Sequence, residues 1–151
     1  MYRARMLPAA AVLLLVGCTS LSQPVPFEER KGLVVVRVRV NGAPPAPFVL
    51  DTGASVSLID ERFARRLGVA PGAARAELTG IGPGNFRRAS VAALAEIALG
   101  EVVQRNGRAV VHDLRAFDSL IGEPVAGVLG YSFLKDHRLI VDYRARQVRL
   151  E

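Results

Sequence analysis

A carboxylate at the end of an apolar run is the feature of this 151-residue sequence with the clearest chemical meaning. Residues 48–50 (Phe-Val-Leu) lead into Asp51, and residues 52–55 (Thr-Gly-Ala-Ser) follow it. A charge at the end of a buried strand carries a large desolvation cost, so it is usually paired or used in chemistry. We therefore expect Asp51 to be used or paired. Our working hypothesis is that it is one half of a centre with two carboxylates, and that a second copy of the chain supplies the other half.

Short strands joined by tight turns are expected to position Asp51. Residues 33–40 become an alternation of valine and arginine, which predicts a strand with the valines facing inward and the arginines outward. Asn41-Gly42 and the prolines after it predict a turn into the strand at 48–50. This hairpin would deliver Asp51 into the molecule.

The chain beyond Asp51 also favours strands and turns. Residues 73–79 and 86–94 predict a hairpin whose tip, residues 80–85, holds three glycines that permit left-handed backbone conformations. Turns are expected at Gly100 and at Asn106-Gly107. Residues 57–60 are expected to be a strand end and helix cap, and residues 127–130 a buried apolar pair between glycines. Further strands are expected at 95–99, 102–103, 109–111, 138–142 and 147–150, with the last two forming a hairpin.

Helical patterns are few and short. Residues 61–67 have an acidic start and a basic end that suit a helix, which Asp60 caps and Gly68 stops. Residues 114–121 are either irregular or a short helix, and residues 131–136 are expected to form a helical turn. The sequence therefore predicts an all-β domain with one or two short helices.

The order of these motifs resembles the retropepsin-like aspartic proteases, above all the small bacterial ones. Besides Asp-Thr-Gly, the matching stretches are Gly-Val-Leu-Gly-Tyr-Ser-Phe-Leu at 127–134 and Ile-Val-Asp-Tyr at 140–143. The resemblance covers about residues 32–151. It implies a closed β-barrel or sandwich with a flap hairpin, and an endopeptidase that hydrolyses peptide bonds with water activated by a pair of aspartates.

The resemblance also assigns roles to matching positions. Asp51 would be the catalytic carboxylate, and Thr52 would hydrogen-bond the partner's loop across the dimer axis. Gly53 would bring its N–H close to the carboxylate, and Ser55 would support the carboxylate from outside. The flap that binds substrate would include Gly80, Ile81, Gly82 and Gly84. The catalytic loop would be supported by Val128, Leu129 and Gly130.

Two positions depart from the family pattern. Pro83 stiffens the flap tip and removes one N–H donor. Ser132 stands where relatives often carry Asp or Asn.

Two carboxyl groups in contact cannot both ionise readily, so the pKa of one falls and that of the other rises. The pair can then accept a proton from water and donate one to the scissile carbonyl. This chain has one Asp-Thr-Gly, and its later aspartates lack the flanking Thr-Gly: Asp113, Asp118, Asp136 and Asp142. An enzyme of this type would be a homodimer, with an extended polypeptide substrate paired to the flap.

The N-terminus predicts export. Residues 1–17 combine two arginines with a short apolar segment, as in a signal peptide, and Cys18 follows Leu-Val-Gly as in a bacterial lipobox. We expect a lipidated Cys18, a linker to residue 26 and a domain at 27–151; an ordinary cleaved signal or an uncleaved anchor are the alternatives. Thr19 in place of Asp favours the outer membrane, with the domain facing the periplasm.

Composition excludes little else. The formal net charge is +6, but the arginines are scattered, which does not suit a nucleic-acid partner. His112 and His137 lie far apart, so neither a metal nor another cofactor is expected. Two alternatives stay open: a catalytically weak lipoprotein of the same fold that binds peptides or serves envelope assembly, and a structural lipoprotein with an incidental motif.

Overall fold

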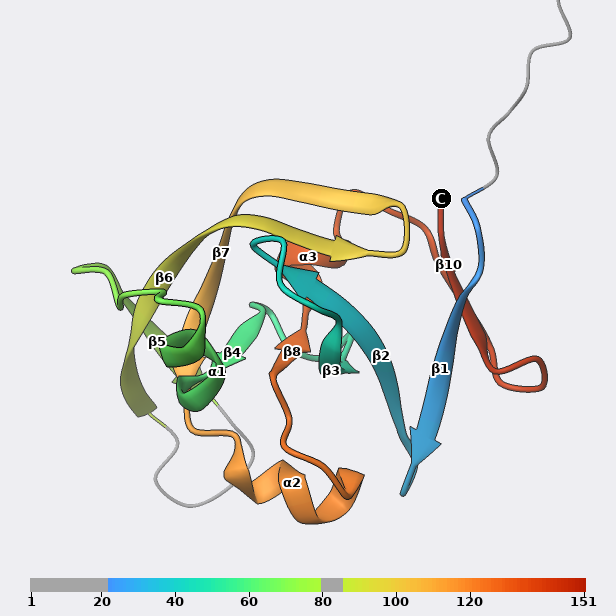
Figure 1. Cartoon of the computed structure of the whole chain (residues 1–151), viewed down its shortest axis with the longest axis horizontal. Helices are drawn as coiled ribbons and strands as arrows, with labels where there is room; N and C mark the ends of the chain where they lie inside the picture. Colours follow the sequence, from blue (N-terminus) through green and yellow to red (C-terminus); the bar gives the residue numbers. More distant parts are fainter. Residues whose placement is uncertain (1–21, 80–85) are drawn as a thin grey trace, which may run out of the picture.

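Six strands close into a β-barrel (Figure 1). The computed structural model describes residues 22–79 and 86–151. The strands of the ring follow one another, and the last pairs with the first, in the order β2 (Leu33–Val40), β3 (Ala46–Leu50), β8 (Gly127–Leu129), β4 (Leu58–Asp60), β7 (Val102–His112) and β6 (Phe86–Leu99). The predicted closed all-β barrel is thereby confirmed.

Further strands extend the barrel at two places (Figure 1). On one side β5 (Arg75–Thr79) pairs with β6. On the other side lie β1 (Val25–Arg30), β10 (Gln147–Leu150) and β9 (Leu139–Asp142). The last two form the predicted C-terminal hairpin.

The N-terminal boundary of the domain lies earlier than the sequence indicated. Val25 and Pro26, which the sequence places in the linker, are the first residues of β1 and pair with Val148 and Gln147. The Ser22 hydroxyl donates to the carbonyl of Leu150. The strand begins there because β10 offers it a backbone partner, which is a contact distant in sequence.

The strand β2 follows its sequence pattern. Val36, Val38 and Val40 are fully buried, whereas Arg37 is exposed and pairs with Glu28 and Glu123. The turn after β2 places Asn41 and Gly42 at positive φ, which those two residue types tolerate best. β2 and β3 then pair antiparallel, as the sequence predicted.

The hairpin of β6 and β7 differs from the prediction. The turn at Gly100 is present, but the expected turn at Asn106-Gly107 is wrong, because β7 runs through these residues. The pairs Leu94–Gly107 and Glu96–Arg105 keep one continuous register on both sides of Asn106, whose φ is 53°. Pairing between two long antiparallel strands therefore keeps Asn106-Gly107 within β7, although the same residue pair often forms a turn between shorter strands.

The described residues contain three short helices, more than the predicted one or two. These are α1 (Glu61–Arg66), α2 (Arg115–Ile121) and α3 (Tyr131–Leu134). α2 covers a small apolar cluster that includes Val35, Val49 and Val128. No helix of 22–79 or 86–151 has the length and apolar character needed to span a membrane.

Asp60 joins α1 to α2 as a buried carboxylate, only 1% exposed. It caps α1 by accepting from the N–H groups of Arg62 and Phe63, and it also accepts from the N–H of Leu114 at 3.0 Å. Arg62 contacts Asp60 and forms a bidentate pair with Asp118. Burial raises the pKa of Asp60, but these hydrogen bonds, led by that from Arg62, outweigh it and leave the pKa below its ordinary value.

Asp60→Ala is expected to lower the free energy of unfolding by roughly 2–4 kcal/mol, because three N–H groups and a guanidinium lose their acceptor. The folded-state pKa of Asp60 is depressed, so its contribution is present above about pH 4 and is lost as pH falls through the folded value. Urea unfolding of the wild type should therefore show a steeper loss of stability in acid than the variant does. Asp136→Ala is the control, because Asp136 is exposed. If Asp136→Ala lost as much stability as Asp60→Ala, the role given to Asp60 would be contradicted.

Candidate active site

Asp51 emerges at the end of a parallel strand pair. β3 and β8 run in the same direction with Leu50 opposite Leu129, so Asp51 and Gly130 leave the barrel at the same edge. The N–H of Asp51 donates to the carbonyl of Leu129 at 3.0 Å, which continues the ladder by one bond. Asp51 is exposed in the single chain, so the expectation that the hairpin delivers it into the molecule is wrong.

The turn after Asp51 holds one oxygen of its carboxylate. The N–H of Gly53 donates to Asp51 Oδ1 at 2.8 Å, and a Cβ on Gly53 would lie 3.2 Å from that oxygen. Thr52, Gly53 and Ser55 are all exposed. In the described part of the chain the Ser55 side chain makes no hydrogen bond, so the fixed contact to Asp51 comes from Gly53 rather than from Ser55.

Gly130 supports this turn from beneath. A Cβ there would lie 2.6 Å from the carbonyl oxygen of Val56 and 2.7 Å from that of Ala54, both of them backbone atoms. The N–H of Tyr131 donates to the carbonyl of Ala54 at 2.8 Å. Val128 and Leu129, which precede Gly130, are buried. The segment predicted to support the catalytic loop therefore ends at the Asp51 turn.

Sequence reasoning missed Ser57 as a residue of the site. It is only 2% exposed, and its Oγ accepts from the N–H of Gly130 at 3.1 Å. Its own N–H donates to Ser132 Oγ at 2.9 Å. The available signal was a hydroxyl residue directly before the apolar Leu58-Ile59, at a position that a strand of this pattern would bury.

The predicted flap lies partly outside the described residues. Gly80, Ile81, Gly82 and Gly84 belong to that undescribed segment, as does Pro83, and Cys18 lies in the undescribed N-terminus. The two strands that lead to the flap, β5 and β6, are described. They pair antiparallel, from Arg75 opposite Ser90 to Thr79 opposite Phe86.

A hollow of about 250 Å³ adjoins the exposed side of the turn. Thr52 lines it together with the start and end of α3 and the start of β9. Tyr131 is 57% exposed there, so much of its ring is open to a partner. The Thr52 face of the molecule therefore carries apolar surface beside the candidate carboxylate.

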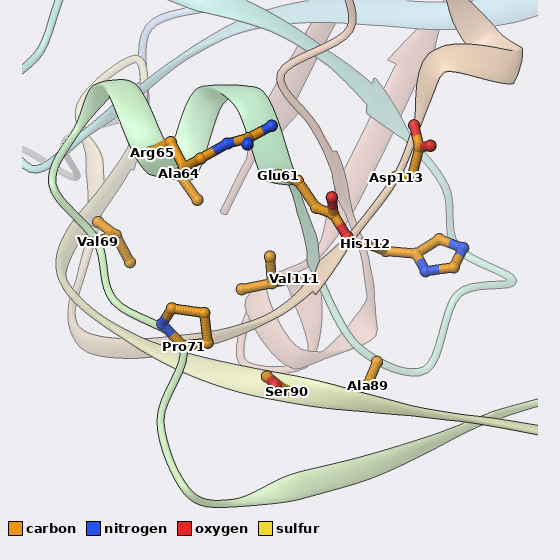
Figure 2. Close-up of a pocket in the computed structure, with 10 residues that line it drawn as sticks. All are labelled: Glu61, Ala64, Arg65, Val69, Pro71, Ala89, Ser90, Val111, His112 and Asp113. Atoms are coloured by element: carbon orange, nitrogen blue, oxygen red, sulfur yellow. The ribbon is translucent and has the colours of Figure 1, made fainter.

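A second hollow, of about 420 Å³, lies elsewhere (Figure 2). Glu61, Ala64 and Arg65 on α1 face Ser90 on β6 and Val111 on β7 across it. None of its lining residues belongs to the Asp51 turn or to the segment after β8, so it is separate from the candidate site. In 22–79 and 86–151, no three His, Cys, Asp or Glu residues are grouped as a metal site would need.

The fold and the site together define a class. The barrel is closed, an exposed Asp-Thr-Gly turn follows a buried strand, and this turn packs on a glycine that follows the parallel partner strand. Together these features define a retropepsin-like aspartic protease. Residues 36–133 match the family model described as "Aspartyl protease", and the chain belongs to this family. Comparison with curated protein sequences gave no match.

Comparison with solved structures finds one likeness strong enough to support this fold. A retropepsin-like aspartic protease from Rickettsia conorii superposes with a TM-score of 0.57 at 20% identity, over 85% of this chain and 87% of that one. The retroviral protease-like domain of Ddi1 from Leishmania major gives a TM-score of 0.49 at 17% identity, over 79% and 94%. The first of these likenesses establishes a common fold and, by itself, no activity.

Proposed function

We propose that this protein is an aspartic endopeptidase that acts on polypeptides as a homodimer, with Asp51 as its catalytic residue. The observation that carries the proposal is the exposed Asp51 carboxylate, held on one oxygen by the N–H of Gly53. A backbone donor fixes the carboxylate without adding a second charge, so the other oxygen is free to face water and substrate.

A second carboxylate has to come from another copy of the chain. Within the described residues, Asp60 and Asp118 are both engaged by Arg62. Asp113 is paired with Arg115. Two Asp51 turns facing each other across a two-fold axis would meet through residues 51–53, which are exposed in one chain.

The chemistry follows from that pairing. Two adjacent carboxyl groups share one proton, because both cannot be ionised in contact. The ionised Asp51 takes a proton from a water molecule as the water oxygen attacks the scissile carbonyl, and the protonated Asp51 of the other copy donates to the carbonyl oxygen. The tetrahedral intermediate then collapses: the Asp51 that took the water proton donates it to the amide nitrogen, and the C–N bond breaks. The amine leaves, and a hydroxyl of the intermediate returns its proton to the Asp51 of the other copy, which leaves a carboxylic acid product and the pair in its starting state.

The proposal includes a lipid anchor on Cys18 that holds the domain at the outer membrane, facing the periplasm. Support comes from the sequence of residues 1–18, and from β1 starting at Val25, which leaves a short tether. Confinement to a membrane raises the effective concentration of the chains and favours a weak dimer. Acyl labelling of Cys18, with membrane fractionation, tests the anchor.

A peptide-library digest tests the activity. The full chain in detergent and its Asp51→Asn variant are incubated from acidic to neutral pH, and the products are identified by mass spectrometry. The proposal expects cleavages that the wild type makes and the variant does not. Identical products from the two proteins would reject Asp51 as the catalytic residue and leave the peptide-binding alternative.

Tyr131→Glu is expected to weaken self-association by about tenfold or more, because an exposed aromatic beside Thr52 would become a buried charge at the proposed interface. Sedimentation equilibrium in detergent measures the dissociation constant. Tyr143→Glu is the matched control, since Tyr143 is 62% exposed but packs on Phe27 in the β9–β10 hairpin region. Equal effects of the two variants would exclude the Thr52 face as the interface.

A further inference from the structure

Two serine hydroxyls, the buried one of Ser57 and the partly buried one of Ser132, form a polar pair beneath the Asp51 turn. The N–H of Ser57 donates to Ser132 Oγ at 2.9 Å, and the Ser132 hydroxyl donates to Ser57 Oγ at 3.1 Å. Ser57 Oγ also accepts from the N–H of Gly130. Buried hydroxyls contribute little to stability compared with an apolar core of the same shape, so their use here indicates a need for defined geometry.

The pair sits where it fixes the far end of the turn. Residues 51–57 are attached to residues 129–132 along their length: at Asp51 through the Leu129 carbonyl, at Ala54 through the Tyr131 N–H, and at Ser57 through the two hydroxyls. The carbonyl of Ser57 accepts from the N–H of Val110 on β7. A loop held at both ends and in the middle by one short segment moves only if that segment moves.

Gln104 fixes the segment in turn. Its Nε2 donates to the carbonyl of Ser132 at 3.1 Å, which supplies a donor to a helix too short to satisfy its own carbonyls. A Cβ at Gly107 would lie 3.2 Å from Gln104 Oε1 and 3.0 Å from Ile97 Cδ1. The Asn-Gly pair inside β7, which looked like a turn in the sequence, therefore leaves room for the Gln104 side chain.

We infer that Ser132 is a positioning residue of the catalytic site: its hydroxyl sets the geometry of the Asp51 turn through Ser57, and Gln104 holds Ser132 in place. The effect of Ser132 on catalysis, as distinct from its effect on the turn, rests on the proposed function. Two carboxylates that must share one proton across a dimer axis require the two turns to keep a fixed geometry, and a displacement of about 1 Å can cost about 100-fold in rate.

The test compares four variants of the full chain in detergent with the wild type. Ser132→Ala removes the hydroxyl, Ser132→Thr keeps it, and Gln104→Ala removes the outer support. Ser119→Ala is the matched control, because Ser119 is exposed on α2 and its hydroxyl makes no hydrogen bond within the described chain. The readouts are kcat and KM on a peptide cleaved by the wild type, and amide hydrogen exchange in residues 51–57.

Ser132→Ala is expected to lower kcat by about 10- to 100-fold with KM within about threefold, and to speed exchange in residues 51–57 but not in β2. Ser132→Thr should return kcat to within about threefold of the wild type, and Gln104→Ala, which keeps both hydroxyls and the fold, should lower kcat by about three- to tenfold. Wild-type kcat and exchange in Ser132→Ala would overturn Ser132 as a positioning residue, and the same result in Gln104→Ala would overturn Gln104 as its support. A loss confined to KM would also overturn the inference.

Amide exchange separates this inference from the proposed function. If the wild type cleaves no peptide, the proposed function fails, and faster exchange of residues 51–57 in Ser132→Ala still supports Ser132 as the residue that positions the turn. Unchanged exchange in that case overturns the inference as well. If the wild type cleaves peptides and Ser132→Ala matches it in both readouts, the inference alone fails.

Discussion

Asp51→Asn is expected to lower kcat/KM for peptide hydrolysis by roughly 10⁴-fold while the fold persists, because an amide can accept the Gly53 N–H but cannot exchange a proton with water. Asp51 is exposed, so the substitution buries no new polar group and leaves the core intact. Thermal unfolding checks the fold, and initial rates on a peptide from the digest give kcat/KM. Residual activity within tenfold of the wild type would contradict a catalytic role.

The same variant tests whether two chains share one site. In random pairing, an equal amount of Asp51→Asn chains is expected to reduce the activity of a fixed amount of wild type to about one half, and a threefold excess to about one quarter. A chain active by itself would lose nothing. Asp136→Asn chains serve as the control, because they carry an intact site and should add activity when mixed with the wild type.

Local patterns were enough to predict what positions Asp51. The valines of β2 face inward because strand residues alternate, and the Asn41-Gly42 turn follows from the positive φ those residues tolerate. The Asp60 cap of α1 was also readable, since a capping carboxylate needs only the next turn of helix. Each of these features depends on neighbours within a few residues.

The supports of the turn could not be predicted in the same way. Ser57 and Ser132 are 75 positions apart, and the antiparallel pairing of β4 with β8, with Leu58 opposite Val128, brings them together. The Asn106-Gly107 pair carries a turn signal that its long antiparallel partner overrides. Likewise, Val25 is a strand residue only because β10 lies beside it. The sequence shows the residue types, but it does not show which residues distant in the chain will lie next to each other.

Gly130→Ala is expected to have the second-largest effect, a loss of about 100-fold in kcat/KM together with about 1–3 kcal/mol of stability. The backbone at Gly130 has φ −106° and ψ −172°, which alanine adopts without strain. The added Cβ would instead meet the carbonyl oxygens of Val56 and Ala54 at 2.6 and 2.7 Å. These are backbone atoms of the Asp51 turn, so relief requires the turn itself to shift.

Gly68→Ala is the matched control for that prediction. Gly68 has φ 65° and open space around it, so alanine there costs about 1 kcal/mol of backbone strain and touches nothing near Asp51. Urea unfolding and kcat/KM on one peptide should then separate the two variants: Gly68→Ala loses stability alone, and Gly130→Ala loses both. Wild-type kcat/KM in Gly130→Ala would show that the position of the turn does not depend on its contact with Gly130. The turn would then be positioned by its hydrogen bonds to residues 129–132, not by van der Waals contact with Gly130.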